Sequence, residues 1–408
     1  MEGVGARRSA LILLDAVLRR GQTLDSAAQT VAPDDKPLAL AIAGEALRRL
    51  PDLDSLIDSA TRQRLPDDAK ARMVLRLALA QKIALNVPDH ALVATALPLV
   101  DGGPRRLVHG VLGTLLRKGV PAPESARLPD DVEERWRSAW GEDAVNAARR
   151  AILRRPPLDL NFADAERATQ FAGELGGVQL APGHVRLHGG AAVSDLPGYG
   201  SGEWWVQDLA ASLPARLMPK GPGDVLDLCA APGGKTMQLA AAGHRVTALD
   251  RSESRLRRLG ANLRRTGLPA TTVVADALEW SGGPFDAILL DAPCSATGTF
   301  RRHPEVLYRA RPRIISEGAD LQARLLAHAA TLLRPGGTLV YAVCSLEPEE
   351  GEQIIEAQDG LKIDPIHSEE LPSGILPHDR GWLRILPGML EEEGGLDGFF
   401  IARLRRHG

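Results

Sequence analysis

Apolar residues recur at intervals of three and four through the first 120 residues of the chain. This period places them on one face of a helix, and it is clearest over 10–18, 38–50, 71–83 and 107–116. The segments are separated by Pro51, Pro66, Pro88 and Gly102-Gly103-Pro104. The pattern predicts a bundle of α-helices.

The pattern changes at about residue 203, where short apolar runs alternate with amphipathic segments. Strands are predicted over 224–228, 245–250, 271–276, 285–291 and 337–343, with a last strand over 396–404. Helices are predicted over 235–242, 253–266 and 320–333. Regular alternation of strand and helix is typical of a mostly parallel, doubly wound sheet, so we expect a Rossmann-like α/β domain.

The residues between these two patterns are mixed. A helix carrying Trp136 and Trp140 is predicted within 129–165, with a strand at 154–162, and 166–200 is rich in glycine. We interpret this region as a small α+β connector of the RRM-like kind. The chain of 408 residues is thus predicted to be multidomain, with parts 1–122, 123–202 and 203–408.

Charge and cysteine content narrow the protein class. The net charge is −3, but residues 1–120 hold 17 Lys or Arg against 13 Asp or Glu, so the bundle has either a phosphate-contacting face or an ordinary solvated surface. Three cysteines make no disulfide framework and favour a reducing, cytoplasmic setting. We expect no signal peptide, no membrane span and, from the Cys and His spacing, no metal site.

Acidic residues at the ends of three predicted strands indicate a cofactor site. The first strand passes Asp227 and continues into Cys229-Ala230-Ala231-Pro232-Gly233-Gly234-Lys235, which is neither a dinucleotide fingerprint nor a P-loop. Asp250 and Asp276 end the next two strands. Carboxylates accept hydrogen bonds from ribose hydroxyls and repel phosphates, so the three strand-end acids suit a nucleoside cofactor without phosphates. A plain βα turn and a helix N-cap at Asp250 are the structural alternatives.

Two cysteines also follow predicted strands. Cys294 ends Asp291-Ala-Pro-Cys294, and Cys344 follows 337–343, so both thiols are expected in the crevice at the carboxyl edge of the sheet. A thiolate that adds to C6 of a cytosine activates C5 toward a methyl donor, and Asp291 could contact N3 and the exocyclic amine. The residues alone leave open which thiol attacks, and a free cysteine can also be a small buried hydrophobe.

Two charged segments complete the candidates. Arg301, Arg302 and His303 form either a phosphate clamp beside the target base or an ordinary exposed loop. The acidic run 347–352 is interpreted as a solvated helix start, and Glu391-Glu-Glu393 as a loop.

Taken together, Ala-Ala-Pro-Gly-Gly-Lys, Asp-Ala-Pro-Cys-Ser and Tyr-Ala-x-Cys-Ser resemble the motifs of the NOL1/NOP2/Sun family of RNA cytosine-5 methyltransferases over about 203–408. The resemblance implies a class I methyltransferase domain that binds S-adenosylmethionine through 229–235, Asp250, Asp276 and Asp291. It also implies Cys344 as the nucleophile and Cys294 as the group that assists product release. Val343 departs from the family, which commonly has threonine there.

The first 120 residues resemble a NusB-type RNA-binding bundle through Asn86-Val-Pro-Asp-His90 and 105–112, although His109-Gly110 stands where an asparagine is usual. The combination resembles bacterial enzymes acting on 16S rRNA, which implies an RNA partner and a monomer. Three alternatives remain: a NusB-like assembly factor with a non-catalytic methyltransferase domain, a cytosine-5 enzyme acting on another RNA such as tRNA, and an oxidoreductase.

Overall fold

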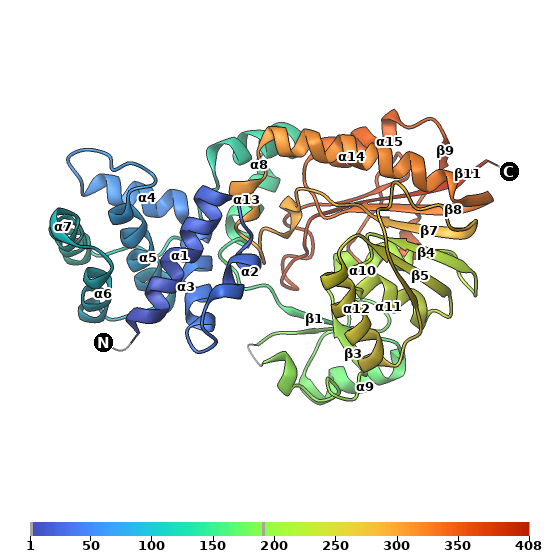
Figure 1. Ribbon diagram of the computed structural model, residues 1–408, viewed down its shortest axis with the longest axis horizontal. Coiled ribbons are helices and arrows are strands. Elements are labelled where there is room, and N and C mark those ends of the chain that lie inside the picture. Colours follow the sequence, from blue (N-terminus) through green and yellow to red (C-terminus); the bar gives the residue numbers. More distant parts are fainter. Residues whose placement is uncertain (1–2, 190–191, 408) are drawn as a thin grey trace. The chain divides into compact units, whose positions relative to one another are not determined.

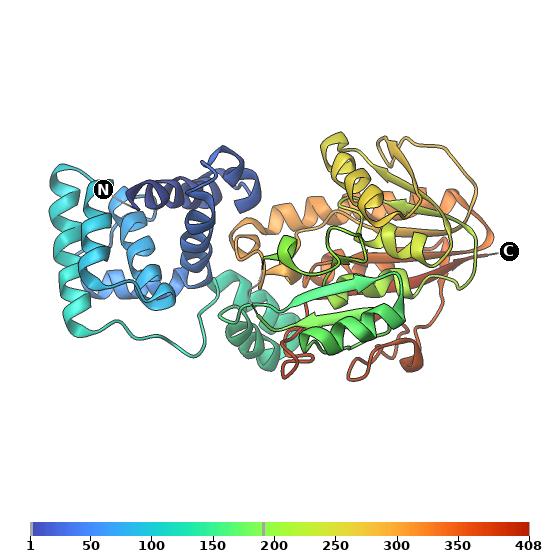
Figure 2. The ribbon, with the colours of Figure 1, turned by 90° about the horizontal axis from the view of Figure 1, so that it is seen from below.

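The computed structural model describes residues 3–189 and 192–407, and it separates into two compact units. The helical unit comprises Met1–Arg155 and Phe300–Arg311, and the α/β unit comprises Pro156–Thr299 and Pro312–Gly408 (Figures 1 and 2). This division differs from the three predicted parts, because the connector's helix lies in the helical unit and its strands lie in the α/β unit.

The helical unit confirms the predicted bundle. Its helices are α1 (Val4–Arg20), α2 (Leu24–Ala27), α3 (Lys36–Arg48), α4 (Leu50–Ser59), α5 (Lys70–Leu85), α6 (Asp89–Ala96), α7 (Gly102–Lys118), α8 (Asp130–Ala151) and α13 (Val306–Arg309). Helix α5 is the centre of the bundle, since every residue over 71–81 is buried. Pro51 does not separate helices as predicted but lies in the first turn of α4, where a missing N–H costs little.

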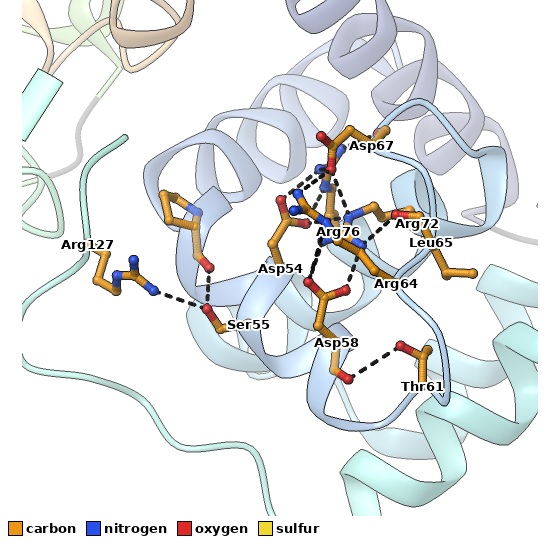
Figure 3. Close-up of polar contacts among 11 residues, drawn as sticks. Asp54, Ser55, Asp58, Thr61, Arg64, Leu65, Asp67, Arg72, Arg76 and Arg127 are labelled. Carbon is orange, nitrogen blue, oxygen red and sulfur yellow. Dashed lines mark hydrogen bonds and ion pairs between the residues drawn. The ribbon is translucent and has the colours of Figure 1, made fainter. Parts of the chain in front are cut away.

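Two arginines of α5 are buried against acidic residues of α4 (Figure 3). Arg72 is 0% exposed, and its guanidinium donates to Asp58 Oδ1 at 2.7 Å and to Asp54 Oδ1 at 3.0 Å. Arg76 is 3% exposed and donates to both carboxyl oxygens of Asp54. Buried arginines are tolerated only when they are paired in this way, so these contacts fix α4 on α5.

A short segment from late in the sequence completes the helical unit. Phe300 packs on Trp136 with ring centroids 5.4 Å apart, and Tyr308 Oη donates to Leu47 O at 2.7 Å. Glu305 is 1% exposed, and its carboxylate accepts a hydrogen bond from Leu24 N at 3.2 Å. Residues 300–311 therefore belong to the bundle although they follow Cys294 in the chain.

The main sheet of the α/β unit confirms the predicted Rossmann-like fold. Its strands are β4 (Asp224–Leu228), β5 (Arg245–Asp250), β6 (Thr271–Val274), β7 (Phe285–Asp291), β8 (Leu333–Val343), β9 (Leu361–Ile363), β10 (Leu383–Ile385) and β11 (Phe399–Arg406). The order is β10-β11-β8-β7-β4-β5-β6, and β9 pairs with β11. Neighbours from β8 to β6 are parallel, whereas β11 is antiparallel to β8.

Helices cover both faces of this sheet. Helices α10 (Leu209–Arg216), α11 (Gly234–Ala241) and α12 (Glu253–Thr266) lie on one face, and α14 (Pro312–Thr331) and α15 (Glu352–Ala357) on the other (Figure 1). Burial on both faces explains why the central strands are continuous apolar runs. The chain order reverses between β4 and β7, which is the point where open α/β sheets bind ligands.

A smaller antiparallel sheet contains the predicted strand of the connector. Strands β1 (Leu158–Phe162), β2 (His184–Leu187) and β3 (Trp204–Val206) pair in the order β2-β1-β3, with α9 (Ala165–Leu175) packed on them. Asp159 is buried, and its carboxylate accepts hydrogen bonds from Arg186 Nε at 2.7 Å and from Leu209 N at 2.9 Å. Because Leu209 begins α10, this buried carboxylate ties the small sheet to the main one.

Candidate active site

The carboxyl edge of the main sheet gathers most of the predicted site residues. Reading across parallel neighbours from β8 to β6, the strand ends carry Cys344, Asp291, Cys229, Asp250 and Asp276. The two cysteines expected to do chemistry thus come from β8 and β7, and the expected cofactor residues come from β4, β5 and β6.

The two predicted thiols meet. Cys294 Sγ lies 3.6 Å from Cys344 Sγ, which confirms the expectation that both cysteines share one site. The backbones of their loops are also joined, since Gly298 N donates to Cys344 O at 3.0 Å. Gly298 must be glycine, because a Cβ there would lie 2.0 Å from Gly398 O.

The protonation of the cysteines differs with their surroundings. The hydrogen bond to Cys344, together with burial, raises the pKa of Cys294 well above that of a free thiol. Burial, with the nearby carboxylates, raises the pKa of Cys229 to about 12. Both of these thiols therefore hold their protons at neutral pH, and the Cys229 side chain packs half-buried against the core of the sheet.

Lys235 and Asp291 form an ion pair across the switch point. Lys235 Nζ lies 2.7 Å from Asp291 Oδ2 and 5.4 Å from the ring centroid of Phe399. Burial opposes the charge on Lys235, but the contact with Asp291 outweighs it and raises the pKa of the lysine. The side chain of Asp291 remains 32% exposed, so it is accessible to a ligand at this edge.

The loop after β4 has the geometry of a ligand cradle. Cys229 and Gly233 have φ values of 62° and 108°, and a Cβ at Gly233 would lie 2.8 Å from Leu259. Asp250 supports this loop by accepting from Ala231 N at 3.2 Å, and its other oxygen accepts from Ser252 N at 2.8 Å. Asp276 is exposed beyond the end of β6.

Asp227 is predicted only as one of the three strand-end acids, without a role of its own, yet it is the most perturbed acid of this edge. It is 0% exposed, and its Oδ2 accepts from Thr236 Oγ1 at 2.6 Å. Its Oδ1 has no hydrogen-bond partner among the described residues. Burial raises the pKa of Asp227 to about 7. The sequence signal was its position in the first parallel strand, directly before the loop.

The charges at this edge fit a cationic nucleoside. Asp291, Asp250 and Asp227 all act electrostatically on Cys229, each raising its pKa. An excess of carboxylates, with an orphaned buried oxygen on Asp227, suits a sulfonium and an ammonium group and disfavours phosphates. The residues present therefore fit S-adenosylmethionine, with 229–235 and the strand-end acids as its proposed ligands.

The acidic run 347–352 corrects one prediction. It was expected to be a solvated helix start, but Glu347 and Glu350 are 1% and 0% exposed. Glu350 accepts hydrogen bonds from Ser295 and Ser345, the residues that follow the two cysteines. Sequence reasoning missed all three residues, and the only signal was a serine directly after each cysteine.

The predicted phosphate clamp lies in the helical unit. Arg301 is 4% exposed, and its carbonyl accepts from Arg48 Nη1 at 2.6 Å, so its side chain is not presented to a phosphate as expected. Arg302 is half-buried, and His303 is exposed with its Nδ1 3.8 Å from Glu305. RNA contact by Arg302 and His303 stays a prediction.

The fold and the site together define a Rossmann-like methyltransferase with two cysteines at the edge of its sheet. The model of the family described as 16S rRNA methyltransferase RsmB/F matches residues 214–405, and that of the NusB family matches 5–117. The chain belongs to the 16S rRNA methyltransferase RsmB/F family, which confirms the resemblance inferred from the motifs. Membership of a methyltransferase family confirms the predicted cofactor, S-adenosylmethionine.

Similar proteins span nearly the whole chain. Ribosomal RNA small subunit methyltransferase B of Xylella fastidiosa (strain Temecula1) is 36% identical and covers 99% of this chain and 98% of its own length. The protein of the same name from Klebsiella pneumoniae (strain 342) is 34% identical, with 98% of each chain covered.

Solved structures share the fold. PH0851 superposes with a TM-score of 0.75 at 23% identity, covering 100% of this chain and 99% of its own. A methyltransferase homolog protein from Pyrococcus horikoshii has a TM-score of 0.56 at 27% identity, covering 72% of this chain and 98% of its own.

The described residues contain neither a membrane-spanning helix nor a metal-binding cluster. Over 3–189 and 192–407, no helix has both the length and the apolar composition that crossing a bilayer requires. Across the same ranges, no three His, Cys, Asp or Glu side chains are grouped so that they could hold a metal ion.

Proposed function

We propose that this protein methylates C5 of a cytosine in 16S ribosomal RNA through a covalent adduct between a cysteine and C6. The observation that carries the proposal is the 3.6 Å separation of Cys294 Sγ and Cys344 Sγ, since both atoms can then reach one pyrimidine. Support for small-subunit rRNA comes from the relatives, which are named as methyltransferases of that RNA. The target base has to leave its stack to reach the thiols.

Cys344 is the proposed nucleophile. The pKa of Cys294 is raised by the hydrogen bond to Cys344, so Cys294 keeps its proton and can donate it, whereas attack requires a thiolate. In the first step the Cys344 sulfur forms a bond to C6, and the electron pair of the C5–C6 double bond shifts toward N3. Asp291, held by Lys235, is the proposed contact of N3 and of the exocyclic amine.

S-adenosylmethionine, when bound, supplies the methyl group that C5 takes up. Release then requires that C5 lose its proton and that the bond between C6 and the Cys344 sulfur break, which restores the C5–C6 double bond. Cys294, whose Sγ lies 3.6 Å from that of Cys344, is proposed to give its thiol proton to the departing sulfur, and the resulting thiolate can accept the proton from C5. This exchange leaves both cysteines as thiols, since Cys344 holds the proton that Cys294 gave and Cys294 holds the proton that C5 lost. Cys344 then releases its proton to solvent before the next attack, so the cycle needs no further reactant.

The remaining expectations belong to the same proposal. Arg302 and His303 are proposed to contact RNA phosphates, and the exposed basic residues of the bundle to contribute to RNA binding. Three free cysteines, two of them with proposed chemical roles, suit the reducing cytoplasm. The enzyme is proposed to act as a monomer.

The test is incubation of the full-length protein with unmodified 16S rRNA and labelled methyl donor, followed by denaturing electrophoresis. We expect Cys294→Ala to accumulate a protein–RNA adduct, and Cys344→Ala to give neither adduct nor product. The reverse pattern would exchange the two roles, and absence of an adduct from both variants despite methylation by the wild type would refute the covalent route. A parallel incubation with tRNA separates the two RNA substrates.

A further inference from the structure

A single buried carboxylate joins the loops that carry the two thiols. Glu350 Oε1 accepts from Ser295 N at 2.8 Å and from Gln322 Nε2 at 3.1 Å. Its Oε2 accepts from Ser345 Oγ at 2.6 Å and from Ser295 Oγ. Ser295 directly follows Cys294 and Ser345 directly follows Cys344. Both loops are therefore bonded to the same carboxylate, and its Oε2 accepts from both serine hydroxyls.

The surroundings hold this carboxylate in place. Tyr341 Oη donates to the carbonyl of Glu350 at 2.6 Å. Gln322 of α14 donates to Pro293 O at 3.0 Å, so it contacts the residue before Cys294 as well as Glu350. Gly318 of the same helix must lack a side chain, because a Cβ there would lie 2.8 Å from Glu350 Oε1.

Stability alone is a poor reason for an acid at this position. A carboxylate that is 0% exposed loses its hydration, and burial indeed raises the pKa of Glu350 against the opposing hydrogen bonds from Ser295 and Ser345. An apolar side chain of similar size would avoid that cost. What it could not provide is a shared acceptor for two loops that are 50 residues apart in the chain.

We propose that Glu350 is a positioning residue: its carboxylate crosslinks the Cys294 and Cys344 loops and thereby sets the distance between the two sulfur atoms. The proposal rests on the function proposed above, in which both sulfurs act on one base. Because its side chain is 0% exposed, Glu350 acts through Ser295 and Ser345. A loss of this crosslink is expected to affect the chemical step and to leave the binding of both substrates unchanged.

The first experiment measures the pairing of the thiols without RNA or methyl donor. Diamide accepts the two thiol hydrogens as the Cys294–Cys344 disulfide forms, and peptide mapping by mass spectrometry follows the bond. We expect Glu350→Leu to form it about tenfold more slowly than the wild type, because the loops are no longer held together. Glu356→Leu is the matched control, since Glu356 is exposed on α15, and it is expected to react at the wild-type rate.

Rescue by glutamine distinguishes hydrogen bonding from charge. In Glu350→Gln the amide oxygen can still accept from the N–H groups of Ser295 and Gln322, and the serine hydroxyls can rotate to accept from the amide nitrogen. Glu350→Leu is expected to lower kcat by about a hundredfold at unchanged KM. We expect Glu350→Gln to restore most of that kcat and most of the rate of disulfide formation. A glutamine variant as impaired as the leucine variant would overturn the crosslinking role.

Ser345→Ala keeps the test decisive if Glu350→Leu does not fold. It removes one arm of the crosslink and leaves the carboxylate in place, and we expect both slower disulfide formation and a lower kcat. Wild-type values for both quantities in folded Ser345→Ala would refute the proposal. Because the disulfide assay uses no RNA, its outcome stands even if the wild-type protein makes no 5-methylcytosine, so the two proposals fail separately.

Discussion

Binding of the methyl donor is predicted to strengthen as the pH rises, through Asp227. The side chain is 0% exposed, and burial raises its pKa to about 7. A cation bound at this edge favours the ionised carboxylate, so the donor selects that form. The ionised fraction of such a group increases about tenfold between about pH 6 and about pH 8, and the Kd of S-adenosylmethionine should fall by about the same factor.

Calorimetry measures the proton directly. Titration in two buffers of different ionisation enthalpy should show release of about 0.9 proton per donor at about pH 6 and about 0.1 at about pH 8. Asp227→Asn should abolish both the release and the pH dependence of Kd. Asp224→Asn is the matched control, because Asp224 lies at the other end of β4 and pairs with Arg245 and Arg334.

The same pKa predicts the stability of the donor-free protein. An acid with a raised folded pKa holds a proton that the unfolded chain loses, so the free energy of unfolding should decrease from about pH 4 to about pH 7, by at most about 1.4 kcal/mol per pH unit. Asp227→Asn should remove this slope. An equal Kd at both pH values in the wild type, or an unchanged slope in the variant, would contradict the reasoning.

Two further substitutions test the packing. Arg72→Met should destabilise the helical unit by about 1–3 kcal/mol, measured by urea unfolding and far-UV circular dichroism, because Asp58 loses its buried partner and Asp54 keeps only Arg76. Arg64→Met, at a side chain 67% exposed, should cost no more than about 1 kcal/mol, and equal effects would refute the argument. Gly298→Ala should lower kcat and destabilise the α/β unit by about 1–3 kcal/mol or more, since its Cβ would meet Gly398 O at 2.0 Å. Gly360→Ala, with nothing within 4 Å, is the control and should leave kcat unchanged.

The central strands could be predicted because each is a buried apolar run bounded by turns. The bounds of β4, β5 and β7 and of helix α12 agree with the predicted ranges. Strand polarity followed from the alternation with helices, and polarity placed Cys294 and Cys344 at one edge. The sequence thus predicted that the two cysteines lie at the same edge. It did not predict that β7 pairs directly with β8, which brings the two sulfur atoms to 3.6 Å.

The two features that the sequence did not predict, the burial of 347–352 and the packing of 300–311, have a common physical origin. The run 347–352 has the composition of a solvated segment, and local composition does not report that two serine loops and α14 enclose Glu350. The segment 300–311 is short and polar, so no periodicity indicated that Tyr308 and Glu305 pack into the helical bundle. Both depend on contacts between residues far apart in the chain, which a pattern read along one segment cannot contain.

The strand order places two groups of residues at the carboxyl edge of the sheet, and the ion pair of Lys235 and Asp291 lies between them. Lys235 follows the loop of β4 and Asp291 ends β7, so the pair crosses the point where the chain order reverses. On one side lie the acids suited to a cationic donor, and on the other lie the two sulfurs. Asp291 is the only acid of this set that adjoins both groups among the described residues, because it ends the strand that also leads to Cys294. Its charge, held by Lys235, can therefore respond to both proposed ligands, and we propose this pair as the structural link between donor binding and the chemistry at the base.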